Sequence, residues 1–322
     1  YNYYVVTVEE SEEDPVDPPV TPEPEPDVEI TEPTAKLTAV SAAFSDNMIL
    51  QRDEKLSVWG TASLLSAGEH IVVEFKGETA AAEVGTDGKW TAVFDNTFPA
   101  DGNGATLTVK GTNKSVTFND VLVGDVYYIV GQSNVFYSMG DLYVDLYQRN
   151  ELSNLVVDYD DNRDIRFFRV SNTDYATQTG TMAQGTETVY DDVYNGEKWM
   201  KPTDIATQII DNAYPVMYDG AAYNTVAVAT ECFSALGYMY AFNLSETDPS
   251  VPVGVMEIDA SGFPLMAFAP NELASKWGKE VYNASTGKYH YKAGTVENTQ
   301  MPTRFVYNQQ IAPLSKFSIA GI

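Results

Sequence analysis

The sequence has few basic residues and very little cysteine. Lys and Arg total 19 against 46 Asp and Glu, which gives a net charge of −27 at pH 7. Because phosphate groups are bound by clustered Lys and Arg, this balance argues against a nucleic-acid partner. The single cysteine, Cys232, cannot form a disulfide within the chain, and in its apolar helical setting we expect a buried, unreactive thiol.

Long apolar runs are also missing. No stretch approaches the roughly 18 apolar residues of a membrane span, and no basic-then-apolar signal peptide precedes the first residues. The chain begins at Tyr1 rather than at a methionine, which predicts a processed or partial product whose targeting segment has been removed. No membrane span is expected. The acidic, Pro-rich segment at residues 9–35 is of a kind common between modules of secreted or cell-surface bacterial proteins, and we expect such a protein here.

Proline and acidic residues are concentrated near the N-terminus. Residues 9–35 combine Pro with Asp and Glu and contain almost no aliphatic clusters, which predicts an extended linker. Residues 1–8, YNYYVVTV, are compatible with the end of an upstream module. The remaining sequence is long and apolar enough for two domains, which we place at 36–120 and 121–322.

The first domain is predicted to be an antiparallel β-sandwich. Short segments of alternating polarity recur about every ten residues, and Asp87-Gly88 is a hairpin signal between two of them. His70 lies on one of these segments, where a packing or surface role is expected. No pattern in this domain is typical of catalysis.

The second domain is predicted to be an α/β fold. Residues 125–131, DVYYIVG, form a continuous apolar run, as expected of a parallel strand that is covered on both faces. A helix is predicted at 233–244, a strand at 251–258, a short helix at 305–314 and a third strand at 317–322. This order predicts a doubly wound parallel sheet.

Residues 141–230 are rich in Tyr, Asp, Asn and Thr, and only 165–170 are predicted to form a strand. We expect the rest to be loops and insertions over the carboxyl edge of the sheet. The segment 158–164, DYDDNRD, resembles the start of a calcium loop, but Arg163 stands where such a loop needs Gly. A solvated acidic loop is therefore favoured, and no metal site is predicted.

The strand at 125–131 ends in Gly-Gln-Ser-Asn. Ligands of open parallel sheets bind beyond the carboxyl ends of the strands, so that Ser133 is expected to face a substrate. Its hydroxyl suits a nucleophile, neighbouring backbone N–H groups suit an oxyanion, and Gln132 and Asn134 add amides for orientation. On these residues alone, an ordinary serine in a polar turn remains the simpler interpretation.

Seven motifs follow one another along the chain: AAFSDNMILQRDEKLSVWGTA, DGKW, TLTVKG, VLVGDVYYIVGQSN, FSALGYMYAFNL, VPVGVMEIDASGFPLMAF and YNQQIAPLSKFSIAGI. In this order they resemble the sialate O-acetylesterase family, serine esterases of the SGNH (GDSL-like) class that carry an N-terminal β-sandwich. The resemblance implies a carbohydrate O-acetylesterase that acts on acetylated carbohydrate and needs no cofactor. Acetylated sialic acid, xylan, mannan or another glycan would suit this class.

The resemblance also implies roles for individual residues. Ser133 matches the family nucleophile, and its own N–H would be one donor of the oxyanion hole. Residues 259–264, DASGFP, fall where the family has Trp-Gly-Gly-Thr-Pro, which contributes another donor. Gly262 matches the second glycine of that motif, whereas Ser261 replaces the first. The motif's tryptophan and threonine are also replaced, which indicates an altered pocket.

The family continues beyond the strand that matches 317–322 into Trp-Tyr-Gln-Gly-Glu-Ser and later Asp-x-x-His, which supplies the base and its orienting acid. Since this chain ends at Ile322, we expect it to be truncated, with base and acid on a downstream segment or a second chain. Neither His70 nor His290, which is expected in a loop, is assigned a catalytic role.

The 322 residues alone are therefore expected to be weakly active or inactive. The alternative is a non-catalytic surface, adhesion or carbohydrate-binding protein derived from such an esterase. The altered segment at 259–264 and the 21 tyrosines are compatible with that alternative.

Overall fold

The structure is a computed structural model that describes residues 30–155, 157, 163–170, 189–193, 198–212, 232–261, 265–270, 273, 279–283, 288–293, 296–298 and 306–322. Residues 1–8, most of the linker predicted at 9–35, and Gly262 lie outside the described residues. The same is true of the acidic positions in the calcium-like segment, 158–162.

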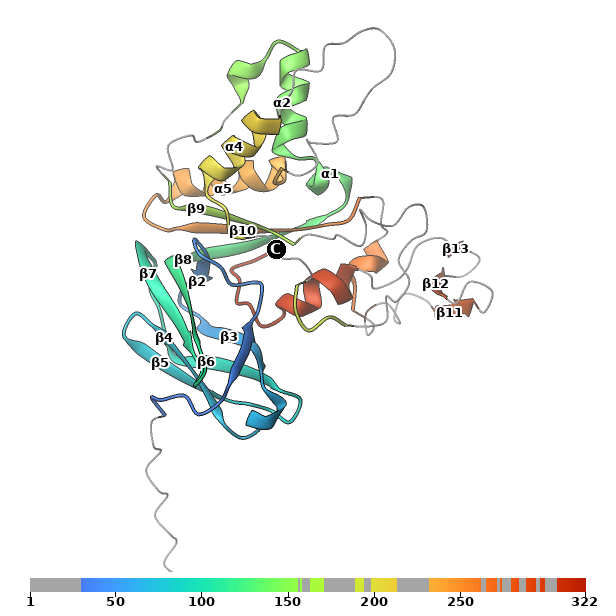
Figure 1. Cartoon of the computed structure of the whole chain (residues 1–322). Helices are drawn as coiled ribbons and strands as arrows, with labels where there is room; N and C mark the ends of the chain where they lie inside the picture. Colours follow the sequence, from blue (N-terminus) through green and yellow to red (C-terminus); the bar gives the residue numbers. More distant parts are fainter. Residues whose placement is uncertain are drawn as a thin grey trace, which may run out of the picture.

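The N-terminal part is a sandwich of two sheets (Figure 1). The first sheet is antiparallel and consists of β1 (Leu37–Val40), β3 (Lys55–Ala62) and β6 (Lys89–Thr97). The second consists of β5 (Glu78–Glu83), β4 (His70–Phe75), β7 (Asp101–Lys110) and β8 (Ser115–Gly131), with β2 (Ile49–Gln51) parallel to β8. Trp59, Trp90 and Phe94 are buried in the core that includes both sheets. The predicted antiparallel β-sandwich is confirmed.

Strand β8 belongs to both halves of the molecule (Figure 1). Its first part pairs antiparallel with β7, and residues 125–131 pair parallel with β10 (Val253–Asp259). The domain boundary predicted between residues 120 and 121 falls inside this strand. The polypeptide therefore leaves the sandwich and enters the α/β sheet without a linker.

The α/β part is a parallel sheet in the order β9 (Ile165–Arg169), β10 and β8. Gly321 forms a parallel bridge with Tyr127 on the other side of β8, so that residues from the predicted third strand also pair there. One face is covered by α4 (Pro202–Asn212) and α5 (Ala235–Thr247), and α2 (Met139–Gln148) packs against these two helices. The other face carries η5 (Tyr307–Ile311), η6 (Ala312–Leu314) and the sandwich.

Strand β10 is apolar at most positions because both of its faces are covered. Val253 and Val255 belong to the core beneath α5, whereas Met256 and Ile258 belong to the core shared with the sandwich. Neighbouring residues of a strand point to opposite faces, so a strand covered on both sides must be apolar at nearly every position. The prediction of a doubly wound α/β fold is thus confirmed.

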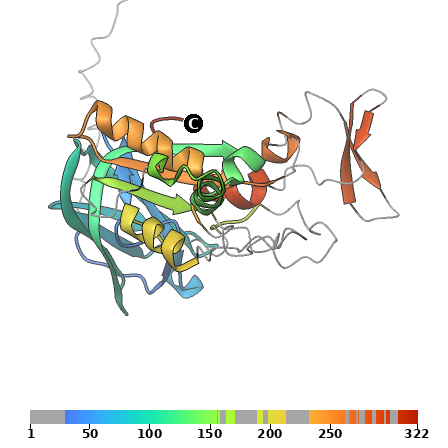
Figure 2. The ribbon, with the colours of Figure 1, turned by 90° about the horizontal axis from the view of Figure 1, so that it is seen from above.

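The prediction of loops over the carboxyl edge at 141–230 is wrong where the chain forms helices α2 and α4. Helix α4 packs on β9 beside α5, and α2 packs against α4 and α5 and projects away from the sheet, so that Figure 2 shows it end-on. In α4, Ile205, Ala206 and Ile209 are buried on one side, and the remaining described positions are largely polar. Such a narrow apolar stripe is easily mistaken for loop composition.

His290, which was expected in a loop, lies in a strand. It belongs to β12 (Lys288–Ala293), which pairs antiparallel with β11 (Lys279–Asn283) and β13 (Val296–Asn298). Figure 2 shows this small sheet to one side of the α/β layers.

The described residues also form the short helices η1 (Leu64–Ser66), η2 (Leu152–Asn154) and η4 (Leu265–Phe268). Among the described residues, no helix combines the length and apolar character needed to cross a membrane.

Candidate active site

Ser133 follows β8 at the carboxyl edge of the parallel sheet and begins α1 (Ser133–Phe136), a single helical turn. The Gln132 carbonyl accepts hydrogen bonds from the N–H groups of Val135 and Phe136, at 2.9 and 3.0 Å. The residues Gln132, Ser133 and Asn134 are exposed, and no described residue forms a hydrogen bond with the Ser133 hydroxyl. The first N–H groups of a helix have no acceptor within it, so the Ser133 N–H is directed out of the turn.

The glycine before this turn has a steric reason. A Cβ atom at Gly131 would lie 2.7 Å from a methyl carbon of Val135, which is buried. Real side chains essentially never approach so closely, because dense packing leaves no room for such an overlap. Gly131 therefore lets α1 fold back onto the end of β8, which holds Ser133 in place.

The end of β10 lies beside the Ser133 turn. Asp259 is the register partner of Gly131, and the Ala260 N–H donates to the Gly131 carbonyl at 3.1 Å. Ser261 comes next in the chain. The structure thus brings the beginning of the predicted oxyanion segment to the Ser133 turn, while Gly262 lies outside the described residues.

Three charged side chains are buried beneath this edge, on the face that α5 covers. Arg169, the last residue of β9, has its Nε 3.7 Å from Glu257 Oε1 and an Nη atom 3.6 Å from Asp259 Oδ2. Its guanidinium also lies 5.8 Å from the ring centre of Phe136 in α1. The cluster of Arg169, Glu257 and Asp259 therefore lies directly against the helical turn that begins with Ser133.

Glu257 is fully buried, and this burial raises the pKa of its carboxyl group well above the usual value. The positive charge of Arg169 opposes the shift, whereas the nearby Asp259 carboxylate adds to it. Glu257 Oε1 has no hydrogen bond among the described residues. Buried carboxyl groups with a raised pKa occur often at functional sites, and this one lies beside the candidate nucleophile.

Glu257 also connects to the segment that follows Ser133. Its Oε2 accepts a hydrogen bond from the Ser234 N–H at 2.8 Å, at the start of α5. The next N–H, of Ala235, donates to the Tyr137 carbonyl, and the Phe233 carbonyl accepts from Met139. Glu257 therefore holds the start of α5, and the start of α5 holds the residues directly after α1.

Ser133 was predicted from the sequence, whereas the cluster of Arg169, Glu257 and Asp259 was not. A signal was present, because both strands carry acidic or basic residues at their carboxyl ends within otherwise apolar runs. A charge inside such a run must be paired when it is buried. In the described part of the chain, no group of three His, Cys, Asp or Glu side chains could hold a metal ion.

The fold and the serine-bearing edge define an α/β protein with a β-sandwich at its N-terminus, and the fold is similar to that of a solved structure. A carbohydrate acetylesterase from Xanthomonas citri is 22% identical, with a TM-score of 0.58 over 89% of this chain and 49% of that protein. At this identity the similarity shows the fold alone. The chain spans about half the length of that protein. No protein-family model matches the chain, and no curated protein matches it significantly.

Proposed function

We propose that the protein is a carbohydrate O-acetylesterase with Ser133 as its nucleophile. The observation that carries the proposal is an exposed serine at the carboxyl end of a parallel strand, in a fold shared with a carbohydrate acetylesterase. The order of sequence motifs that resembles the sialate O-acetylesterase family supports it further. Acetylated sialic acid, xylan, mannan or another acetylated glycan would be the substrate. The enzyme itself would be a secreted or cell-surface bacterial protein.

In the proposed reaction, Ser133 Oγ attacks the acetyl carbonyl carbon while a general base takes the hydroxyl proton. The tetrahedral oxyanion accepts hydrogen bonds from the Ser133 N–H and from the segment of Ser261 and Gly262. The C–O bond to the sugar breaks, the sugar oxygen takes the proton, and an acetyl ester forms on Ser133. A water molecule, deprotonated by the same base, then releases acetate and restores the serine.

The general base and its orienting acid belong, in this proposal, to a downstream segment or a second chain. Support comes from the exposed Ser133 hydroxyl, which has no hydrogen-bond partner among the described residues. A serine hydroxyl is a weak nucleophile without an adjacent base. In the family that the sequence resembles, an Asp-x-x-His motif fills this role.

The test is acetate release by the full-length protein from acetylated xylan and from p-nitrophenyl acetate. Ser133→Ala is expected to lower kcat by at least ~10³-fold, because the nucleophile is lost. The matched control is Ser153→Ala, a change at an exposed serine of η2. Unchanged rates in Ser133→Ala, or equal losses in both variants, would contradict the proposal.

A second candidate is a carbohydrate-binding protein that has lost esterase activity. The altered segment at 259–264, where Ser261 replaces a glycine of the family motif, and the 21 tyrosines favour it. Glycan binding that survives Ser133→Ala, together with no acetate release by the full-length protein, would select this function over the esterase.

A further inference from the structure

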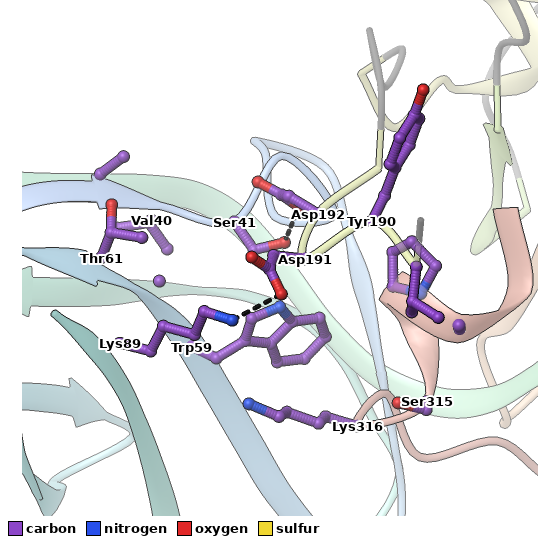
Figure 3. A pocket seen from close by; sticks show the side chains of 15 residues that line it. Val40, Ser41, Trp59, Thr61, Lys89, Tyr190, Asp191, Asp192, Ser315 and Lys316 are labelled. Atoms are coloured by element: carbon purple, nitrogen blue, oxygen red, sulfur yellow. Dashed lines mark hydrogen bonds and ion pairs between the residues drawn. The ribbon is translucent and has the colours of Figure 1, made fainter. Parts of the chain in front are cut away.

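A cavity of about 300 Å³ lies between the sandwich and two later parts of the chain, residues 189–192 and 312–316 (Figure 3). Its walls also include residues of β1 and β3, and Lys89 of β6. None of its lining residues belongs to the Ser133 turn or to the cluster of Arg169, Glu257 and Asp259. The cavity is therefore a feature separate from the candidate active site, and we refer to it as the junction pocket.

The acidic residues of the junction pocket are already engaged with the sandwich. Asp191 accepts a hydrogen bond from Lys89 Nζ at 2.6 Å. Asp192 accepts from the Ser41 hydroxyl at 2.5 Å and from the Ala42 N–H at 3.0 Å. These contacts fasten the segment at 189–193 to strands of the first sheet and fix the positions of both carboxylates.

Lys316, the other lysine that lines the junction pocket, has no acidic partner among the described residues. Lys316 Nζ donates to the Thr91 hydroxyl at 2.8 Å, and no carboxylate of the described residues lies within ion-pair distance of it. Figure 3 shows Lys89 and Lys316 beside the indole of Trp59. Lys316 therefore keeps N–H donors for a ligand in a molecule whose surface is otherwise strongly acidic.

The charges in the junction pocket balance. Two lysines and two aspartates line it, which leaves no net charge although the whole chain carries −27. The lining offers both donors and acceptors, since the lysines and Ser315 have N–H and O–H groups and the aspartates have carboxylate oxygens. This lining suits an uncharged ligand with many hydroxyl groups better than an ion of either sign.

Part of the lining is apolar and held rigidly. Trp59 is 4% exposed and packs edge-on against Phe44, with ring centres 4.7 Å apart. Tyr190 is fixed by its hydroxyl, which accepts from Gln309 Nε2 at 3.3 Å, and by its N–H, which donates to the Asn308 carbonyl. A sugar ring has apolar C–H faces and a polar edge, which matches such a mixed lining.

We propose that the junction pocket is a second carbohydrate site, which binds an uncharged sugar unit of the glycan. Its volume is at the lower end of the range for small-molecule pockets, which fits a short glycan segment rather than a long chain. Only the class of ligand rests on the proposed function. Lys316 and Asp191 are the side chains that would hold the sugar hydroxyls.

The test is binding of xylotetraose and mannotetraose to the full-length protein, measured by isothermal titration calorimetry. At least one of the two sugars is expected to bind the unaltered protein. Lys316→Ala and Asp191→Ala should each raise the Kd of that sugar at least ~tenfold, because hydrogen bonds to charged groups are lost. Both side chains lie at the surface, so the fold should survive the changes. The control is Lys110→Ala, a lysine of β7 that pairs with Glu74 away from the pocket.

Hydrolysis of p-nitrophenyl acetate separates this inference from the proposed function. Lys316→Ala and Asp191→Ala should leave that rate unchanged, whereas Ser133→Ala should abolish it and leave sugar binding intact. No binding of either sugar to the unaltered protein, or equal binding by Lys316→Ala, Asp191→Ala and the control, would overturn the second site. If Ser133→Ala kept full p-nitrophenyl acetate hydrolysis while the sugar-binding results were as expected, only the esterase proposal would be overturned.

Discussion

Arg166 and Arg169 lie on the same strand, β9, and both side chains are largely buried, at 6% and 12% exposure. Because they are three residues apart, they point to opposite faces of the sheet. Arg166 pairs with Asp120 at 3.2 Å, where β8 leaves the sandwich. Arg169 pairs with Glu257 and Asp259 beneath the Ser133 turn.

The two arginines meet carboxyl groups in opposite states. The pKa of Asp120 would be raised by its partial burial, but the Lys201 ammonium at 3.0 Å and Arg166 lower it overall. The pKa of Glu257 is raised, because full burial outweighs the charge of Arg169. Access to water and a second cation therefore decide whether the carboxyl group stays ionised. Asp120 joins the two halves of the molecule as a charged residue, whereas Glu257 lies beside the Ser133 turn, where burial favours its neutral form.

The largest expected effect comes from removing the buried carboxyl group. Glu257→Ala removes most of a fully buried side chain and leaves the Ser234 N–H without its acceptor, and should cost about 2–5 kcal/mol of unfolding free energy. Urea denaturation measures this loss. The control is Glu246→Ala, whose side chain is 63% exposed and pairs with Arg163, with an expected cost of about 0.5 kcal/mol. Equal costs for the two variants would break the comparison.

The next effect comes from the glycine before Ser133. Gly131→Ala places a methyl group against Val135 and should cost about 1–3 kcal/mol, with a drop in kcat as α1 shifts. The control is Gly321→Ala, where the nearest atom to a new Cβ is 3.6 Å away, an ordinary contact. Thermal denaturation and p-nitrophenyl acetate hydrolysis measure the two effects. Full activity in Gly131→Ala would show that the close packing of α1 does not position the serine.

The smallest effect is a difference in pH dependence. Burial raises the pKa of Glu257 in the folded state, so its contribution to stability is complete below the usual pKa of 4.5 and falls as the pH rises above it. Asp120 behaves oppositely: its contribution is present above pH 3.8 and is lost as the pH falls. Urea denaturation between acid and neutral pH should show that Glu257→Gln removes the first dependence and Asp120→Asn the second. Identical pH profiles for both variants would contradict the assignment.

The strands and the Ser133 turn were predictable because their signals are local. Alternating or continuous apolar runs mark β3 to β8 and β10, and Gly-Gln-Ser-Asn follows directly on a strand. The Arg169–Glu257 contact was not predictable, since it depends on the parallel register that places these two residues side by side. The junction pocket likewise joins segments more than 100 positions apart, such as Lys89 and Asp191.

The most direct test of Ser133 as the nucleophile is to identify the residue that becomes acetylated during the reaction. The full-length protein would be mixed with an acetyl ester, quenched in acid within one turnover, digested, and analysed by mass spectrometry. The account predicts that the peptide containing Ser133 gains the mass of one acetyl group, and that Ser133→Ala shows no acetylated peptide. Acetate release without acetylation of Ser133, or acetylation of another residue, would contradict the assignment of Ser133 as the nucleophile.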